Sequence, residues 1–225
     1  MNQDLLHLIG LFATKPQSEV LQHLSKKDSN EITKMLFSLL VLYFNDSNSS
    51  TLREATIVRL CGFNLDTNKL GYNGYRQSSI AEQDWCEAKP VNIKTQSLAK
   101  NPRKLDGNAN ISDFTHKRLA KLESDNPTII VGGFIDGRLF YIFSFKFKHQ
   151  PLIQDLKTQL LKQLPDGDKP SIYLRSANIK FSKYLSAPDL DLQLFVNKST
   201  LEEHQRFVSK TVYSKLLSRF DSLRS

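Results

Sequence analysis

The sequence predicts an α/β (α+β) fold in which helices flank a central mixed β-sheet. Three observations predict it. Apolar residues recur at helical spacing near both ends of the chain, and short β-branched and aromatic runs lie between them. Two of these runs flank Asp136-Gly137, a dipeptide suited to the type I′ turn of a β-hairpin. The order of helices, then strands, then a helix is typical of a sheet with helices packed on it.

The N-terminal part predicts a helical layer. Apolar stripes at helical spacing fill much of residues 3–44, and a polar loop follows at residues 45–50. We therefore expect residues 1–50 to form an N-terminal helical region and residues 51–225 to form the main domain with its C-terminal helix.

The rest of the chain predicts the strands of the sheet. Residues 85–90 read as a short strand that ends at Pro90. The hairpin at residues 128–147 should lie at the centre of the sheet. The other expected elements are a helix at 52–60, a polar connection at 94–110, helices at 113–122 and 152–164, strands at 172–181 and 190–196, and a long terminal helix at 200–223.

The charge of the chain points to a polyanion as its partner. The 225 residues carry a formal net charge of +8, spread along the sequence and not gathered in one tail. No apolar run approaches the roughly 18 residues needed to cross a bilayer, and no basic segment leads into a signal-peptide core. We expect a soluble, cytoplasmic protein that does not contact a membrane.

Several chemistries find no support in the sequence. Cys61 and Cys86 lack the paired spacing of a zinc site and are expected to be buried, and the five histidines show no metal-ligand spacing. Gly132-Gly133 lacks the Lys-Ser/Thr of a phosphate-binding loop, so we expect no nucleotide cofactor.

Glu87 and Lys89 form the constellation that can carry chemistry. Alternate residues of a strand face the same way, so both side chains project from one face while Ala88 turns into the core. Hydrolysis of a phosphodiester needs a divalent metal held by oxygen ligands, and a carboxylate with a neighbouring backbone carbonyl supplies them. A lysine beside them can orient the attacking water or stabilise developing negative charge.

Around Glu87-Ala88-Lys89 the chain resembles the PD-(D/E)XK nuclease superfamily, which includes many type II restriction endonucleases. The family pattern is an acid near the end of one strand, an acid-x-lysine on the next strand, and often a helical glutamate upstream. The resemblance covers about residues 51–150 and implies a restriction-endonuclease-like sheet between helices. It implies magnesium as cofactor, held by the Glu87 carboxylate, the Ala88 carbonyl and an upstream acid, with Glu54 as the helical glutamate.

The first acid of the family pattern has no clean match, because no Pro-Asp stands at the expected place. Asp66 and Asn73 both lie at a suitable separation from Glu87. Asn73 has the more strand-like surroundings, but a carboxylate is the better metal ligand, so we favour Asp66.

Candidate DNA-binding residues lie in three parts of the chain. Basic and amide side chains of this kind suit phosphate contacts and the reading of base edges. They are Arg76 before the strand, then Lys94, Arg103, Lys104, Asn108, Asn110, Ser112, Asp113, Lys117 and Arg118 after it, and finally Arg175, Asn178 and Lys180.

The expected function is that of a magnesium-dependent, sequence-specific endonuclease acting on double-stranded DNA, as in a type II restriction-modification system. A homodimer is expected, because cutting both strands of a twofold site needs two centres related by symmetry. Two alternatives stay open: a repair or recombination nuclease with the same fold, and a non-catalytic DNA-binding protein in which Glu87 and Lys89 are a surface ion pair.

Overall fold

The computed structural model describes residues 15–46, 50–66, 71–77, 83–96 and 103–222, together with Asp4, His7, Leu8 and Leu11. The chain divides into two units, Met1–Ser49 and Ser50–Ser225. In the described part of the chain, no helix is long and apolar enough to cross a membrane.

The first unit is helical, with α2 at Gln17–Leu24 and α3 at Ser29–Asn45. A capping box starts α3: the Asp28 side chain accepts a hydrogen bond of 2.8 Å from the Glu31 N–H, and the Glu31 carboxylate accepts one of 3.1 Å from the Asp28 N–H. The helix leaves large apolar side chains exposed, among them Phe37 at 68%.

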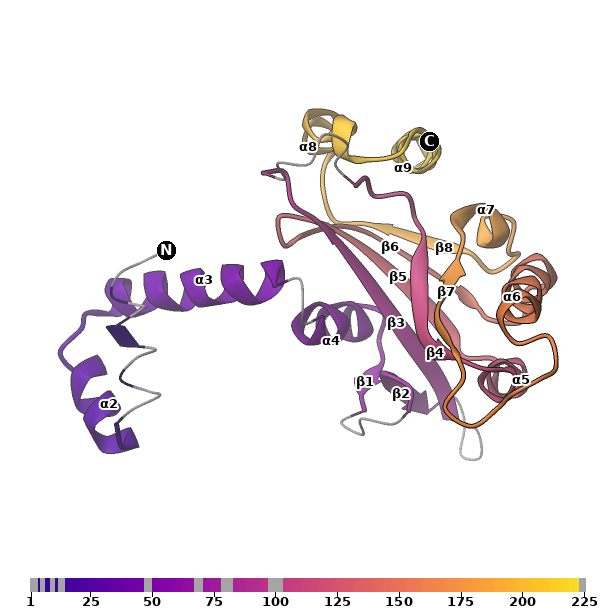
Figure 1. Ribbon diagram of the computed structural model, residues 1–225. Helices are drawn as coiled ribbons and strands as arrows, with labels where there is room; N and C mark the ends of the chain where they lie inside the picture. The colour runs from indigo at the N-terminus through magenta and orange to yellow at the C-terminus, as the bar shows by residue number, and fades with distance from the viewer. Residues whose placement is uncertain are drawn as a thin grey trace. The chain divides into compact units, whose positions relative to one another are not determined.

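A six-stranded mixed sheet forms the centre of the second unit, so the expected fold class is confirmed (Figure 1). Its order is β1-β2-β3-β5-β6-β8. β3 pairs antiparallel with β2 and parallel with β5, and the hairpin of β5 and β6 lies in the middle, as predicted. The strands are β1 at Asn64–Leu65, β2 at Gly74–Gln77, β3 at Gln83–Ile93, β5 at Thr128–Ile135, β6 at Arg138–Lys146 and β8 at Asp191–Leu194.

The sequence predicted a strand that ends at Pro90. This prediction is wrong, because β3 continues to Ile93. The pairing with β2 runs only to Cys86, opposite Gly74. The N–H of Ala88 points to the β2 side, and position 90 points the same way two residues later. A backbone N–H at position 90 would therefore point to the side where β2 no longer pairs with β3. The proline thus removes no hydrogen bond from the sheet.

Two expectations for helices were wrong. The helix expected at 113–122 begins at His116 instead, because residues 109–114 form a strand, β4 at Ala109–Phe114, paired with β7 at Leu174–Ile179. The long terminal helix is divided into α8 at Lys198–Glu203, a short 3-10 helix at Gln205–Phe207 and α9 at Lys210–Ser222. The break occurs where Leu105 forms backbone hydrogen bonds of 2.8 Å with Phe207 and Ser209.

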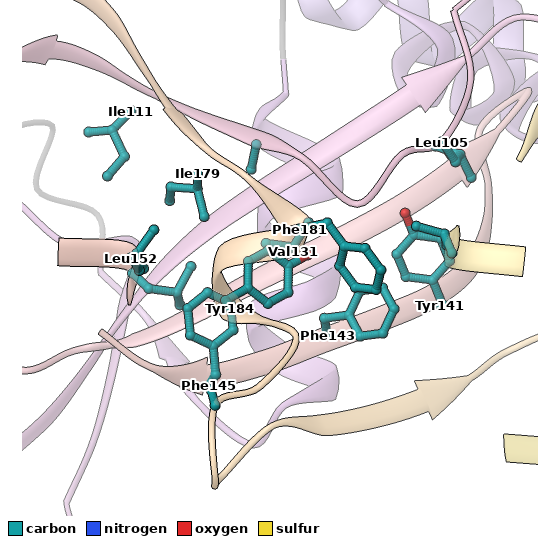
Figure 2. Close-up of a cluster of buried hydrophobic side chains, with 14 of the residues drawn as sticks. Leu105, Ile111, Val131, Tyr141, Phe143, Phe145, Leu152, Ile179, Phe181 and Tyr184 are labelled. Carbon is teal, nitrogen blue, oxygen red and sulfur yellow. The ribbon is translucent and has the colours of Figure 1, made fainter. Parts of the chain in front are cut away.

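Helices cover both faces of the sheet (Figure 1). α4, at Thr51–Leu60, lies on one face; α5, α6 and α7, at His116–Asp125, Gln150–Gln163 and Phe181–Tyr184, lie with the β4–β7 ribbon on the other. The main core fills the second interface, where Phe143, Phe145 and Tyr184 are fully buried and the rings of Phe145 and Tyr184 stack with centroids 4.3 Å apart (Figure 2). This packing fixes β3 and α5, which carry the candidate site.

Candidate active site

A chain of hydrogen bonds joins α4 to the middle of β3 through Asn73. The Asn73 side-chain N–H₂ donates to the Glu54 carboxylate at 3.3 Å, and the Asn73 side-chain oxygen accepts from the Ala88 N–H at 2.8 Å. The Ala88 N–H can only donate, so it fixes which end of the amide faces it. Glu54 also accepts a hydrogen bond from the Ser50 hydroxyl at the start of α4.

The backbone holds Asn73 at this place. Its N–H donates to the Cys86 carbonyl at 3.0 Å, which continues the β2–β3 ladder by one residue, and its carbonyl accepts from the Asp66 N–H at 3.0 Å. Asn73 therefore stands where β2 begins, opposite Glu87 on the neighbouring strand. Where the pairing of β2 with β3 stops, the Asn73 side chain accepts the hydrogen bond of the Ala88 N–H in place of a strand partner.

Glu87 lies on the other face of β3 from Ala88 and is buried, with 4% of its surface exposed. Its Oε1 atom lies 2.8 Å from Lys89 Nζ and 3.2 Å from the Arg118 guanidinium. A buried carboxylate is stable only when it is paired, and two cations from two elements supply the pairing. The prediction that Glu87 and Lys89 share a face of one strand is confirmed.

Arg118 reaches Glu87 from the first turn of α5. Thr115 caps this helix by accepting from the Arg118 N–H at 3.1 Å, and the Asp168 carboxylate accepts from the His116 and Lys117 N–H groups at 2.8 Å each. The Arg118 guanidinium also donates to the Ser112 carbonyl at 2.5 Å. Arg118 thus connects β4 to the carboxylate on β3.

Two other ionisable groups beside the site are held protonated. Burial raises the pKa of the Cys86 thiol to about 12, so this thiol is no nucleophile at neutral pH. Burial, with the hydrogen bond of 2.9 Å that Tyr72 donates to Asp125, raises the pKa of the Tyr72 hydroxyl far above its ordinary value. Neither Cys86 nor Tyr72 therefore supplies an ionised group at neutral pH.

The donor set suits a hard divalent cation such as magnesium. No group of three or more His, Cys, Asp and Glu side chains is placed to hold a metal within the described residues. Magnesium does not need one, because it keeps several waters and binds through one or two carboxylates with substrate phosphates. The Glu87 carboxylate and the Ala88 carbonyl, which points with its N–H to the Asn73 side, are oxygen donors of this kind. Glu54 offers a further carboxylate beside Asn73.

The predicted catalytic residues fall into two groups. Glu87 pairs with Lys89, and with Arg118, on one face of β3, whereas Glu54, Asn73 and the Ala88 N–H form a separate hydrogen-bond network. Asp66, favoured from the sequence as the first acid, joins this network through its backbone N–H on the Asn73 carbonyl. Asn73 occupies the central position between Glu54 and β3.

The predicted DNA-binding residues are more widely spread. Arg76 pairs with Asp84 at 2.8 Å, and Lys180 pairs with Asp155 at 2.8 Å. Asn108 is engaged inside the fold, where its side-chain oxygen accepts from the Phe181 N–H at 2.7 Å. The exposed residues of the set are Lys94, Arg103, Lys104, Asn110, Ser112, Asp113, Lys117 and Arg175, while Arg118 and Asn178 are half-buried.

Sequence reasoning missed two supporting residues. Asp168 caps α5 from a turn 52 positions away from His116, and Tyr72 bonds to Asp125 across 53 positions. Neither pairing leaves a local pattern. No family model matches this chain, and no curated protein sequence matches it, so its residues and their geometry are what indicate a function.

Proposed function

We propose that this chain is a magnesium-dependent endonuclease that hydrolyses phosphodiester bonds of double-stranded DNA at specific sites, as a type II restriction enzyme does. One observation carries the proposal: Asn73 links the helical Glu54 to Ala88, between Glu87 and Lys89. The net charge of +8 supports a polyanionic substrate.

In this proposal the Glu87 carboxylate and the Ala88 carbonyl would hold the metal, and Glu54 would support this strand through Asn73. A bound magnesium ion would neutralise the scissile phosphate and lower the pKa of a water molecule. Lys89 and Arg118 pair with the buried Glu87 carboxylate and compensate its charge. Lys89 Nζ lies within hydrogen-bonding distance of the acid and can orient a water beside it.

Cleavage of unmethylated bacteriophage DNA with magnesium tests the proposal. Wild type should give discrete fragments, and Glu87→Ala and Lys89→Ala should give none. Glu203→Ala and Lys162→Ala are matched controls, because both side chains are exposed on helices or at their ends, and they should cut like wild type. Intact DNA with wild type under both magnesium and manganese would contradict the proposal.

A non-catalytic DNA-binding protein is the second candidate. It is favoured by the amide at position 73 and by the two cations that already pair with Glu87 Oε1. Tight binding of DNA without cutting would select it. Discrete cutting would be consistent with either a restriction enzyme or a repair nuclease. A DNA methyltransferase gene beside the gene for this chain would indicate a restriction enzyme.

The same proposal includes a homodimer, since two active centres would cut the two strands of DNA. It also includes a cytoplasmic location, where the DNA substrate would be met. The exposed apolar face of α3 is the candidate dimer surface: Leu36, Phe37 and Tyr43 are exposed by 54%, 68% and 55%. Sedimentation should find a dimer for wild type and a monomer for Phe37→Glu. A dimer of unchanged stability in that variant would exclude this surface.

A further inference from the structure

Over residues 109–112 and 176–179 the β4–β7 ribbon has one polar face and one apolar face. Its inner pairs, Ala109 opposite Ile179 and Ile111 opposite Ala177, are buried in the main core. Its outer pairs are Asn110 opposite Asn178 and Ser112 opposite Ser176. We call these four outer residues the ribbon polar face.

The ribbon polar face combines two segments that are far apart in the sequence. Asn110 and Asn178 are paired across the two strands, although 68 positions separate them. Asn110, Ser112 and Ser176 are exposed, and Asn178 is half-buried. Four uncharged side chains with hydrogen-bonding groups therefore meet on a surface that the hydrophobic core does not require.

Asn178 is held rigidly but has an unused acceptor. Its backbone N–H donates to the Gln159 side chain at 2.8 Å, and its carbonyl accepts from the same side chain at 2.9 Å. Its side-chain oxygen, in contrast, is buried with no hydrogen-bond partner among the residues that the structure describes. The amide gains a hydrogen bond if it turns outward to a ligand.

The ribbon polar face is connected to the candidate active site. Arg118 donates to the Ser112 carbonyl and pairs with Glu87, so one side chain links this face to the acid on β3. Exposed Lys117 lies in the first turn of α5, shortly after β4, and adds positive charge near the uncharged centre.

We propose that the ribbon polar face reads base edges in the major groove of duplex DNA. This inference rests on the proposed function, which supplies duplex DNA as the partner. A two-stranded ribbon fits the major groove, where an asparagine amide can pair with adenine through two hydrogen bonds and a serine hydroxyl can bond to any base. Because the four side chains are uncharged, they would contribute sequence preference, while exposed Lys117 would contact phosphates.

Selection from a library of duplexes with a randomised segment tests the inference. Binding is measured in the Glu87→Ala background without magnesium, so that no DNA is cut. Glu87→Ala alone should enrich a defined sequence. Adding Asn110→Ala or Asn178→Ala should reduce the preference at one base pair by roughly tenfold or more, as expected for loss of a two-bond contact. Binding to the unselected library should change less than about twofold, since phosphate contacts dominate it.

Gln163→Ala is the matched control, because it removes an exposed amide from the end of α6, and it should leave the preference unchanged. Ser176→Ala is the third ribbon variant, and because Ser176 is exposed, the substitution should not disturb the fold. A sequence that is enriched equally with and without all three ribbon variants would overturn the inference and leave the proposed function standing. No binding to any duplex by the Glu87→Ala chain would overturn both.

Discussion

The side-chain oxygen of Asn73 accepts a hydrogen bond of 2.8 Å from the backbone N–H of Ala88. The other end of the same amide donates to Glu54 at 3.3 Å. A neutral amide thus separates the acid of α4 from the strand that carries Glu87. In the proposed endonuclease, an acid would be expected in this part of the site.

Replacement of Asn73 by Asp should make the stability of the fold respond more strongly to magnesium. The variant keeps an acceptor for the Ala88 N–H but loses the donor to Glu54 and places two carboxylates together, which should lower stability by about 1 kcal/mol. A divalent cation would relieve the repulsion. Thermal unfolding with and without magnesium should show a larger stabilisation by magnesium in Asn73→Asp than in wild type.

Asn73→Ala is the control for this prediction, since it breaks both hydrogen bonds without adding charge. It should lose stability and gain no response to magnesium. An equal effect of magnesium on wild type and Asn73→Asp would mean that Glu54 and position 73 do not share a cation.

Removal of both cations around Glu87 should cost more than the sum of the two single losses. Lys89→Met or Arg118→Met leaves the carboxylate with one partner, whereas the double variant leaves a buried charge unpaired, at a cost of about 3 kcal/mol or more. Urea unfolding of the two single variants and the double variant measures the coupling. In a Glu87→Gln background the same substitutions should be nearly additive, and strong coupling there would contradict the assigned role of Glu87.

Local patterns predicted the parts of the site that lie along one strand. The alternation of a β-strand puts Glu87 and Lys89 on one face, and the runs around Asp136-Gly137 specify the central hairpin. Both follow from neighbours in the sequence. The mixed sheet with flanking helices follows from the order of such elements.

The parts that sequence reasoning missed depend on contacts between distant segments. β4 contains Asn110, Ser112 and Asp113, which are poor strand formers, and Asp113 adopts a positive φ of 50° that interrupts the alternation. It is a strand because β7 pairs with it. Likewise, the break before α9 has no glycine or proline and results from the backbone bonds of Leu105, about a hundred positions earlier.

Gly133→Ala should destabilise the sheet by about 1–3 kcal/mol, because a methyl group there would overlap the buried Tyr141 ring on the neighbouring strand β6. Urea unfolding measures the loss. Gly71→Ala is the matched control: the added carbon would lie 3.9 Å from the Asp66 carboxylate, an ordinary contact, and stability should change by less than about 0.5 kcal/mol. Similar stability of the two variants would show that β5 and β6 can separate to admit the methyl group.

Asp168→Asn should destabilise the chain near neutral pH but not in acid. The carboxylate accepts hydrogen bonds from the Lys117 and His116 N–H groups at the start of α5, and these bonds hold the pKa of Asp168 below its ordinary value.

A carboxyl whose pKa is lower in the folded chain stabilises the fold above its unfolded pKa, and this contribution is lost as the pH falls through the folded pKa. The melting temperature of Asp168→Asn should therefore lie below that of wild type at about pH 7. The gap should narrow as the pH falls below about 4, where the carboxyl of the unfolded chain takes up a proton, and should close below the lower pKa of the folded carboxyl. Asp166→Asn, which removes a carboxylate paired with Lys169 on the surface, should show little difference from wild type at either pH. A gap for Asp168→Asn that stays constant into acid would mean that the charge of Asp168 does not hold the first turn of α5, the turn that presents Arg118 to Glu87.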